Sequence, residues 1–198
     1  MATSRKIRGN VGGYNQAGKK ETITFALDAR FVRILREDAE REGMSVNSKM
    51  NNMLLKYALC YRYTEASRCA IFPYMWAQSV IDGTGEQNLM DQYRSIVHDL
   101  IPSGLLQAKV PLTLPNWLTH FCNGMMLYGG AIEGFSSYRD DEGYLCLVYR
   151  HSYGIKWSRI LSVVLSEFIE NMLKFHTTST ILPSSVVIKI LEKNAEGI

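Results

Sequence analysis

The stretch that decides the fold is residues 23–59, ITFALDARFVRILREDAEREGMSVNSKMNNMLLKYAL. It opens with Ile23, Phe25 and Leu27 at alternate positions, which is the period of a half-buried strand. A strand has a row of backbone N–H and C=O groups that need partners. The residues that follow are typical of helix, turn and helix, and they offer no second strand. The stretch therefore raises the question of where its strand finds a partner.

The two helices have clear start and stop signals. Asp28 is in position to cap a helix over 29–41, Gly43 suits the left-handed residue that closes it, and Ser45 opens the second helix. Each helix has an apolar stripe along one face. The stripe residues are Phe31, Ile34, Leu35 and Ala39 in the first helix, and Val46, Met50, Met53, Leu54 and Tyr57 in the second.

This succession of strand, Asp cap, helix, glycine turn, Ser cap and helix over residues 19–59 resembles the ribbon-helix-helix family of DNA-binding proteins. The resemblance implies that the strand pairs antiparallel with the same strand of a second copy, above four interlocked helices. Burial favours the same arrangement, because a unit this small cannot hold a core alone. A two-stranded ribbon fits the major groove of DNA. We therefore expect a homodimer or higher homo-oligomer that binds double-stranded DNA.

The resemblance also implies which residues touch the duplex. The outward ribbon positions read base edges, and here they are Thr22, Thr24 and Ala26, which offer hydroxyl and methyl groups. Family members more often have Arg, Lys, Asn or Gln at these positions. Either the readout is modest, or the basic N-terminal arm contributes to it. Lys19 and Lys20 lie at the ribbon entrance and are expected to hold phosphates.

A second contact is expected where the second helix begins. Ser45, Asn47, Ser48 and Lys49 surround free N–H groups at the positive end of a helix dipole, which suits a phosphate. The alternative is that Ser45 only caps the helix and Lys49 is solvated.

Charge is concentrated near the beginning of the chain. Residues 1–60 carry 11 Lys/Arg and 6 Asp/Glu, whereas residues 61–198 carry 11 and 13. Residues 1–18 are rich in glycine and small polar residues and are interpreted as a flexible basic arm. Its Arg5, Lys6 and Arg8 either follow the DNA backbone or minor groove, or merely keep the chain soluble.

Residues 60–198 are predicted to form an α+β domain for sensing or oligomerisation. Segments 131–139 and 144–152 are typical of a hairpin, with Gly143 in the turn, and 184–191 is typical of a closing strand. The complete chain is therefore assigned to the α+β class, with a small antiparallel sheet.

The helices of this domain follow from apolar periodicity. Residues 155–175 have an unbroken apolar stripe and predict a long helix. Residues 83–101 predict another helix, which Pro102 is expected to end, and 116–130 predict a short one.

The sequence indicates no enzyme. It lacks the zinc-protease, nucleophile-elbow, dinucleotide and phosphate-loop motifs, and His120 and Cys122 are badly spaced for a metal pair. We expect no catalytic residue, no metal and no cofactor. His151 is interpreted as a packing or capping residue.

Aromatic residues are frequent in the C-terminal domain and have two interpretations. They line a pocket for a small-molecule effector, in which Tyr149, His151 and Trp157 would take part, or they serve the core and a second dimer contact. A protein effector is a further option. The aromatic residues concerned are Tyr61, Tyr63, Phe72, Tyr74, Trp76, Trp117, Phe121, Tyr128, Phe135 and Tyr144.

Four scattered cysteines without a CxxC pair favour a reducing cytoplasm, and no signal peptide or membrane span is evident. Together with the resemblance to the ribbon-helix-helix family, this implies a cytoplasmic transcriptional regulator of prokaryotic type. One alternative is a plasmid partition protein or antitoxin that uses the same DNA-binding module. Another is an enzymatic or metabolite-binding domain that the N-terminal module dimerises.

Overall fold

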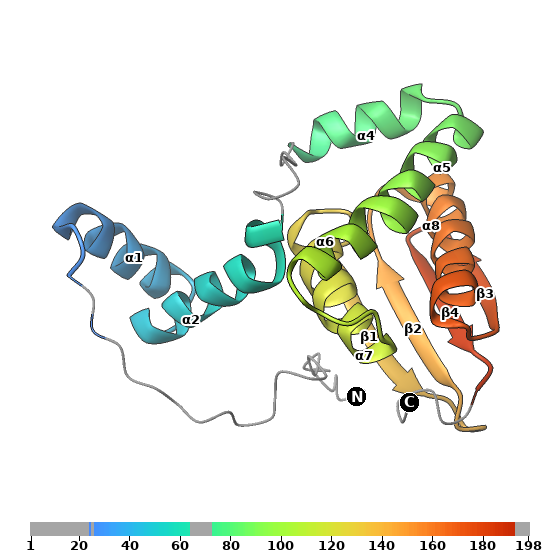
Figure 1. Cartoon of the computed structure of the whole chain (residues 1–198). Helices are drawn as coiled ribbons and strands as arrows, with labels where there is room; N and C mark the ends of the chain where they lie inside the picture. Colours follow the sequence, from blue (N-terminus) through green and yellow to red (C-terminus); the bar gives the residue numbers. More distant parts are fainter. Residues whose placement is uncertain (1–23, 25, 64–72, 193–198) are drawn as a thin grey trace, which may run out of the picture.

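The computed structural model describes residues 24, 26–63 and 73–192 and has the α+β class expected (Figure 1). Helices α1 (Ala29–Arg41) and α2 (Val46–Lys56) come first, followed by the π-helical turn η1 (Tyr57–Tyr61), α4 (Tyr74–Gly83), α5 (Glu86–Ser95), the π-helical turn η2 (Ile96–Leu100), α6 (Ile101–Gln107), α7 (Leu114–Asn116) and the π-helical segment η3 (Trp117–Met126). Strands β1 (Gly134–Arg139) and β2 (Leu145–Arg150), helix α8 (Gly154–Phe168) with its π-helical end η4 (Ile169–Leu173), and strands β3 (Thr177–Leu182) and β4 (Ser185–Ile190) complete the chain order.

The two N-terminal helices have the predicted caps. The Asp28 carboxylate accepts a hydrogen bond from the Arg30 backbone N–H at 2.8 Å, and α1 ends at the predicted residue. Gly43 has a φ of +64°, the left-handed conformation that glycine adopts without strain. Ser45 accepts from the Ser48 N–H at 3.1 Å and opens α2.

The ribbon strand is not confirmed within the single chain. Ile23 and Phe25 lie outside the described residues. Thr24 and residues 26–28 are exposed and have no strand pairing. A strand whose partner comes from a second copy would be unpaired in one copy, so the pairing stays a prediction.

The sheet has the strand order β1-β2-β4-β3, and every neighbouring pair is antiparallel. The predicted hairpin of β1 and β2 is confirmed, with Gly143 at φ +87° in its turn, and β4 is the predicted closing strand. Strand β3 was not expected, because its sequence TTSTIL lacks apolar alternation. In the structure its side chains are mostly exposed. Pairing with β4 as a hairpin makes this segment an edge strand.

Helix α8 packs against one face of the sheet. Leu147 of β2 and Ile188 of β4 are register partners, and both are completely buried. The predicted stripe of α8 covers this face, and Phe168 near its end stacks on Trp117 of η3 at a ring distance of 4.0 Å. Sheet, α8 and the central helices therefore share one hydrophobic core.

Pro102 does not end its helix, contrary to the prediction. The chain continues from α5 through η2 into α6 as far as Gln107. Proline lies in the first turn of α6, where its missing N–H and fixed φ are tolerated. The preceding π-helical turn changes the hydrogen-bonding register at that point.

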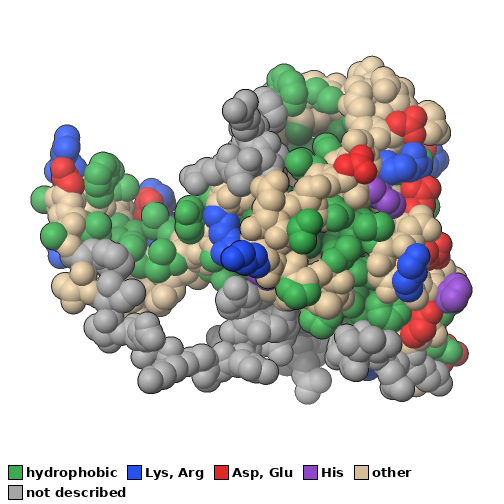
Figure 2. Space-filling view, viewed as in Figure 1, with side chains coloured by type: hydrophobic (Ala, Val, Ile, Leu, Met, Phe, Trp, Pro, Cys, Tyr) green, Lys and Arg blue, Asp and Glu red, His purple; other side chains and the backbone are tan. Residues whose placement is uncertain are grey.

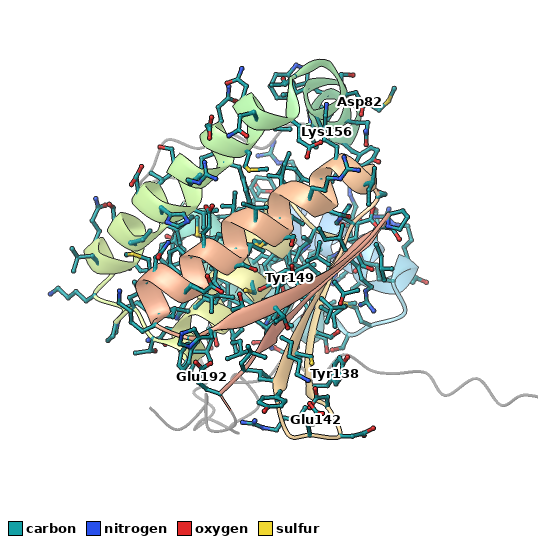
Figure 3. All side chains as sticks on the ribbon, turned by 90° about the vertical axis from the view of Figure 1, so that its right-hand side faces the viewer. Asp82, Tyr138, Glu142, Tyr149, Lys156 and Glu192 are labelled. Carbon is teal, nitrogen blue, oxygen red and sulfur yellow. The ribbon has the colours of Figure 1, made fainter. Side chains whose placement is uncertain are left out.

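Two contacts hold the outer helices to the core. The Lys156 ammonium of α8 donates to the carbonyl oxygens of Ile81, Asp82 and Thr84 at 2.5, 3.2 and 2.8 Å, so a cation caps the C-terminal end of α4 (Figure 3). Segment η1 packs on η3 so closely that a Cβ on Gly124 would lie 2.4 Å from the Leu59 carbonyl oxygen. None of the helices in the described part of the chain is long and apolar enough to cross a membrane.

Asp140 organises the turn between β1 and β2. One carboxylate oxygen accepts the backbone N–H groups of Glu142 and Tyr144, and the other pairs with Lys189 of β4 at 2.6 Å. The Lys189 bond, followed by the backbone bonds, lowers the pKa of Asp140 below its ordinary value of 3.8. The ionised carboxylate thus joins the hairpin to the neighbouring strand.

We predict that Asp140→Ala lowers the urea midpoint of unfolding at pH 7. A depressed folded-state pKa contributes stability above the unfolded pKa and loses it as the pH falls. The difference between wild type and variant should therefore shrink below pH 3.8, the ordinary value of this carboxyl. Asp141→Ala, at an exposed neighbouring position, is the control and should change little. A pH-independent difference would contradict the ionic role.

Candidate nucleic-acid interface

The predicted DNA-contacting residues divide into those the structure describes and those it does not. Arg5, Lys6, Arg8, Lys19, Lys20 and Thr22 lie outside the described residues. Thr24 and Ala26 are described, and both are exposed immediately before the Asp28 cap. Their exposure leaves them free to meet a large partner.

The start of α2 is a tight hydroxyl cluster. The Ser45 and Ser48 hydroxyl oxygens are 2.8 Å apart, and the Ser45 oxygen also receives the Ser48 backbone N–H. Asn47 is exposed, and its backbone carbonyl accepts from the Asn51 amide at 2.9 Å. Ser45 is therefore a cap, as the simpler interpretation has it, while Asn47 and Ser48 remain accessible beside the helix N-terminus.

Lys49 has a partner that the sequence interpretation missed. Its ammonium pairs with the Glu42 carboxylate, and its side chain is only 18% exposed. Glu42 lies on the other side of the Gly43 turn, seven positions earlier, so helical spacing could not reveal the pair. In this structure Lys49 is neither fully solvated nor available without breaking an ion pair.

The Asp28 cap also carries a forked ion pair. The Arg30 guanidinium donates to both carboxylate oxygens of Asp28, with the shortest contact at 2.8 Å. This hydrogen bonding lowers the pKa of Asp28 and raises that of Arg30. The cap stays ionised, and Arg30 is held at the end of the predicted ribbon.

The apolar stripes of α1 and α2 are open to solvent in the single chain. Phe31 is 64% exposed, Ile34 51% and Leu54 53%. Ala39 is the buried residue of α1, and α2 has none. Figure 2 shows hydrophobic side chains on the surface of the lobe that these two helices form. A folded unit does not ordinarily leave such a surface uncovered, so the lobe is suited to a partner.

His151 links three elements of the α+β domain. Its Nδ1 accepts from the Tyr153 backbone N–H at 3.2 Å, and its Nε2 is 2.9 Å from the Ser158 hydroxyl, which itself donates to the Leu182 carbonyl at 2.6 Å. Burial lowers the pKa of His151. The neutral imidazole thus joins the end of β2, the start of α8 and the end of β3, as expected for a capping residue.

Within the part of the chain that the structure describes, no three His, Cys, Asp or Glu side chains gather in a way that could hold a metal ion. Comparison of the chain with protein-family models, with curated proteins and with solved structures finds no match.

We predict that the wild-type chain forms a homodimer and that Phe31→Glu makes it a monomer, because in the dimer a carboxylate would be buried where the apolar stripes of the two copies meet. Analytical ultracentrifugation over a range of protein concentrations measures this. Arg36→Glu, at an exposed position of α1 outside the stripe, should keep the dimer. A wild-type chain that sediments as a monomer at every concentration would refute the dimer.

Proposed function

We propose that the protein is a DNA-binding transcriptional regulator that acts as a homodimer through a ribbon-helix-helix module at residues 19–59. The observation that carries this proposal is the pair of capped helices, joined at Gly43, whose apolar stripes are solvent-exposed. A second copy would cover these stripes and would supply the antiparallel partner for the ribbon.

In the proposed complex the ribbon lies in the major groove. Thr24 and Ala26 then face base edges with a hydroxyl and methyl groups, and the N-terminus of α2 faces a phosphate. Lys49 would exchange Glu42 for that phosphate. The α+β domain, residues 60–198, would sense a signal or extend the oligomer.

The proposal is tested by selection of duplexes from a random DNA pool with the full-length protein. We expect enrichment of an inverted or direct repeat, in keeping with a two-fold dimer. Thr24→Glu should abolish the enrichment, since a carboxylate would face the groove, whereas Thr24→Val keeps the shape and should weaken it only in part. Both variants must still sediment as the wild type. No enrichment by the wild type would refute sequence-specific DNA binding.

A double-mutant cycle tests the phosphate contact at Lys49. Lys49→Ala should weaken binding to all duplexes and make the salt dependence shallower by about one counterion per site. Glu42→Gln should strengthen binding in the wild-type background, because it frees Lys49.

The strengthening by Glu42→Gln should be much smaller when Lys49 is already alanine. Fluorescence anisotropy at several salt concentrations measures both effects. An equal gain in the two backgrounds would mean that Glu42 acts only by repelling DNA. A loss in Lys49→Ala restricted to one sequence would contradict a phosphate role.

A further inference from the structure

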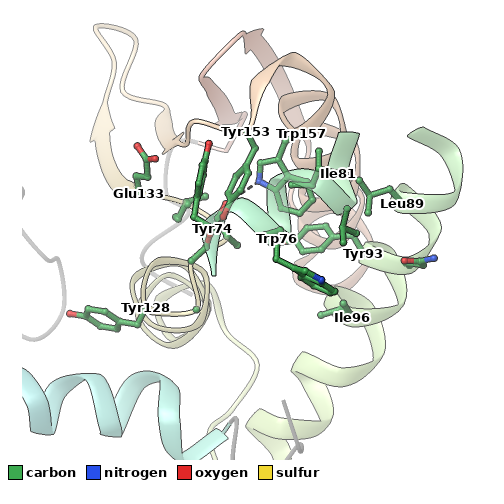
Figure 4. Close-up of a pocket in the computed structure, with 17 residues that line it drawn as sticks. Tyr74, Trp76, Ile81, Leu89, Tyr93, Ile96, Tyr128, Glu133, Tyr153 and Trp157 are labelled. Atoms are coloured by element: carbon green, nitrogen blue, oxygen red, sulfur yellow. Dashed lines mark hydrogen bonds between the residues drawn. The ribbon is translucent and has the colours of Figure 1, made fainter. Parts of the chain in front are cut away.

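A cavity of about 550 Å³ lies between α4, α5, the end of the η3 helix and the start of α8 (Figure 4). This volume is in the range of small-molecule sites. Six aromatic side chains are among its lining residues: Tyr74, Trp76, Tyr93, Tyr128, Tyr153 and Trp157. The sequence left a pocket role open for Trp157, Tyr149 and His151 as one of two interpretations. Trp157 lines the cavity, whereas Tyr149 is completely buried in the core and, like His151, is not part of the lining.

Four of these rings form a connected wall. Tyr74 stacks on Tyr153 with ring centroids 5.0 Å apart. Trp157 lies edge-on to Tyr153 at 6.0 Å and to Tyr93 at 4.9 Å. Figure 4 shows Tyr74, Tyr153 and Trp157 in a row, with Trp76 and Tyr93 on the α5 side. The wall draws on α4 and α5, which are neighbours in the sequence, and on the start of α8, which comes much later in the chain.

Three of the hydrogen-bond donors in this wall are already used by the protein. The Tyr153 hydroxyl donates to the Gly130 carbonyl at 2.8 Å, and the Trp157 indole N–H donates to the Ala131 carbonyl at 2.9 Å. The Tyr74 hydroxyl lies 3.1 Å from the Gln78 side-chain oxygen and donates to it. Burial raises the pKa of Tyr153, so this hydroxyl stays neutral. At Tyr74, Tyr153 and Trp157 the wall therefore presents ring faces rather than free donors.

The charge on the described lining residues of the cavity is negative. Among the described residues that line the cavity there is no Lys, Arg or His, and the charged one is Glu133. Its carboxylate accepts a hydrogen bond from the Ser152 hydroxyl, and Figure 4 shows it beyond Tyr74, at the border of the ring wall. Among the described lining residues an anion would find no counter-charge, whereas a cation would find a carboxylate and several electronegative ring faces.

We propose that this pocket binds an aromatic cation, an organic molecule that combines apolar rings with a fixed positive charge. The rings of the ligand replace water against Tyr74, Tyr153 and Trp157, and its charge lies over ring faces near Glu133. Cations over aromatic faces gain most when the site is partly desolvated. The site stands on its own, without the DNA-binding proposal, and in a regulator it would be the effector site.

Trp76 is the lining residue best suited to a mutational test of this site. It is 51% exposed and lines the cavity from α4, so a bound ligand would cover it without disturbing the core. Its neighbour Met75 is 80% exposed on the same helix and does not line the cavity. The two positions form a matched pair for mutation, and the cap that Lys156 places on α4 should keep the helix in position in both variants.

The test uses tetraphenylphosphonium and tetraphenylborate, which have nearly the same size and shape but opposite charges. Isothermal titration calorimetry with the full chain, without DNA, should show saturable binding of the cation and weaker binding of the anion. Trp76→Ala should weaken cation binding about tenfold, the order expected when a ring face is removed from a partly desolvated cation. Met75→Ala should leave it unchanged.

Glu133→Gln keeps the acceptor for Ser152 and removes the charge. It should weaken binding of the cation and leave the anion unaffected or bound more tightly. Thermal unfolding of each variant checks that the fold is retained. Equal affinity for the two probes, no cation binding at millimolar concentration, or equal losses in the Trp76 and Met75 variants would each overturn the proposal. None of these outcomes depends on DNA binding.

Discussion

Burial of α8 against the inner face of the antiparallel sheet is the interaction on which the rest of the structure depends. The helix packs chiefly on β3 and β4, beside the face on which Leu147 of β2 and Ile188 of β4 are completely buried. The same helix holds η3 through the stack of Phe168 on Trp117 and holds α4 through Lys156. Because the hydrophobic effect scales with buried apolar area, the helix with the most continuous stripe sets where the other elements pack.

In the N-terminal lobe, by contrast, the apolar stripes of the helices are not buried. Its helices are well capped locally, yet their stripes are left open, and the lobe meets the body mainly where η1 packs on η3. The close approach of Gly124 to the Leu59 carbonyl secures that junction and leaves the faces of α1 and α2 free. A lobe with good caps and exposed apolar stripes would gain stability from a partner that covers them, which is why dimerisation is central to the proposed function.

The two proposed binding surfaces differ in how far their side chains are already arranged for binding. At the start of α2 the cap is complete but the cation is engaged, since Lys49 pairs with Glu42, so binding a phosphate there requires an exchange of partners. At the aromatic pocket the ring wall is already assembled, and the hydrogen bonds of Tyr153 and Trp157 to backbone carbonyls fix its geometry. Preorganisation of this kind reduces the entropic cost of binding.

The sequence alone determined what depends on neighbours within a few residues. The Asp28 and Ser45 caps, the Gly43 turn, the hairpin around Gly143 and the stripe of α8 were all predictable, because caps, turns and helical periodicity are local. Only the tertiary structure decided the strand β3, the passage of the helix through Pro102, the Lys49–Glu42 pair and the aromatic pocket. The pocket joins segments that the chain brings together only on folding. The β3 pairing, the π-helical turn before Pro102 and the Lys49–Glu42 pair are closer in sequence, but helical or strand periodicity does not record them.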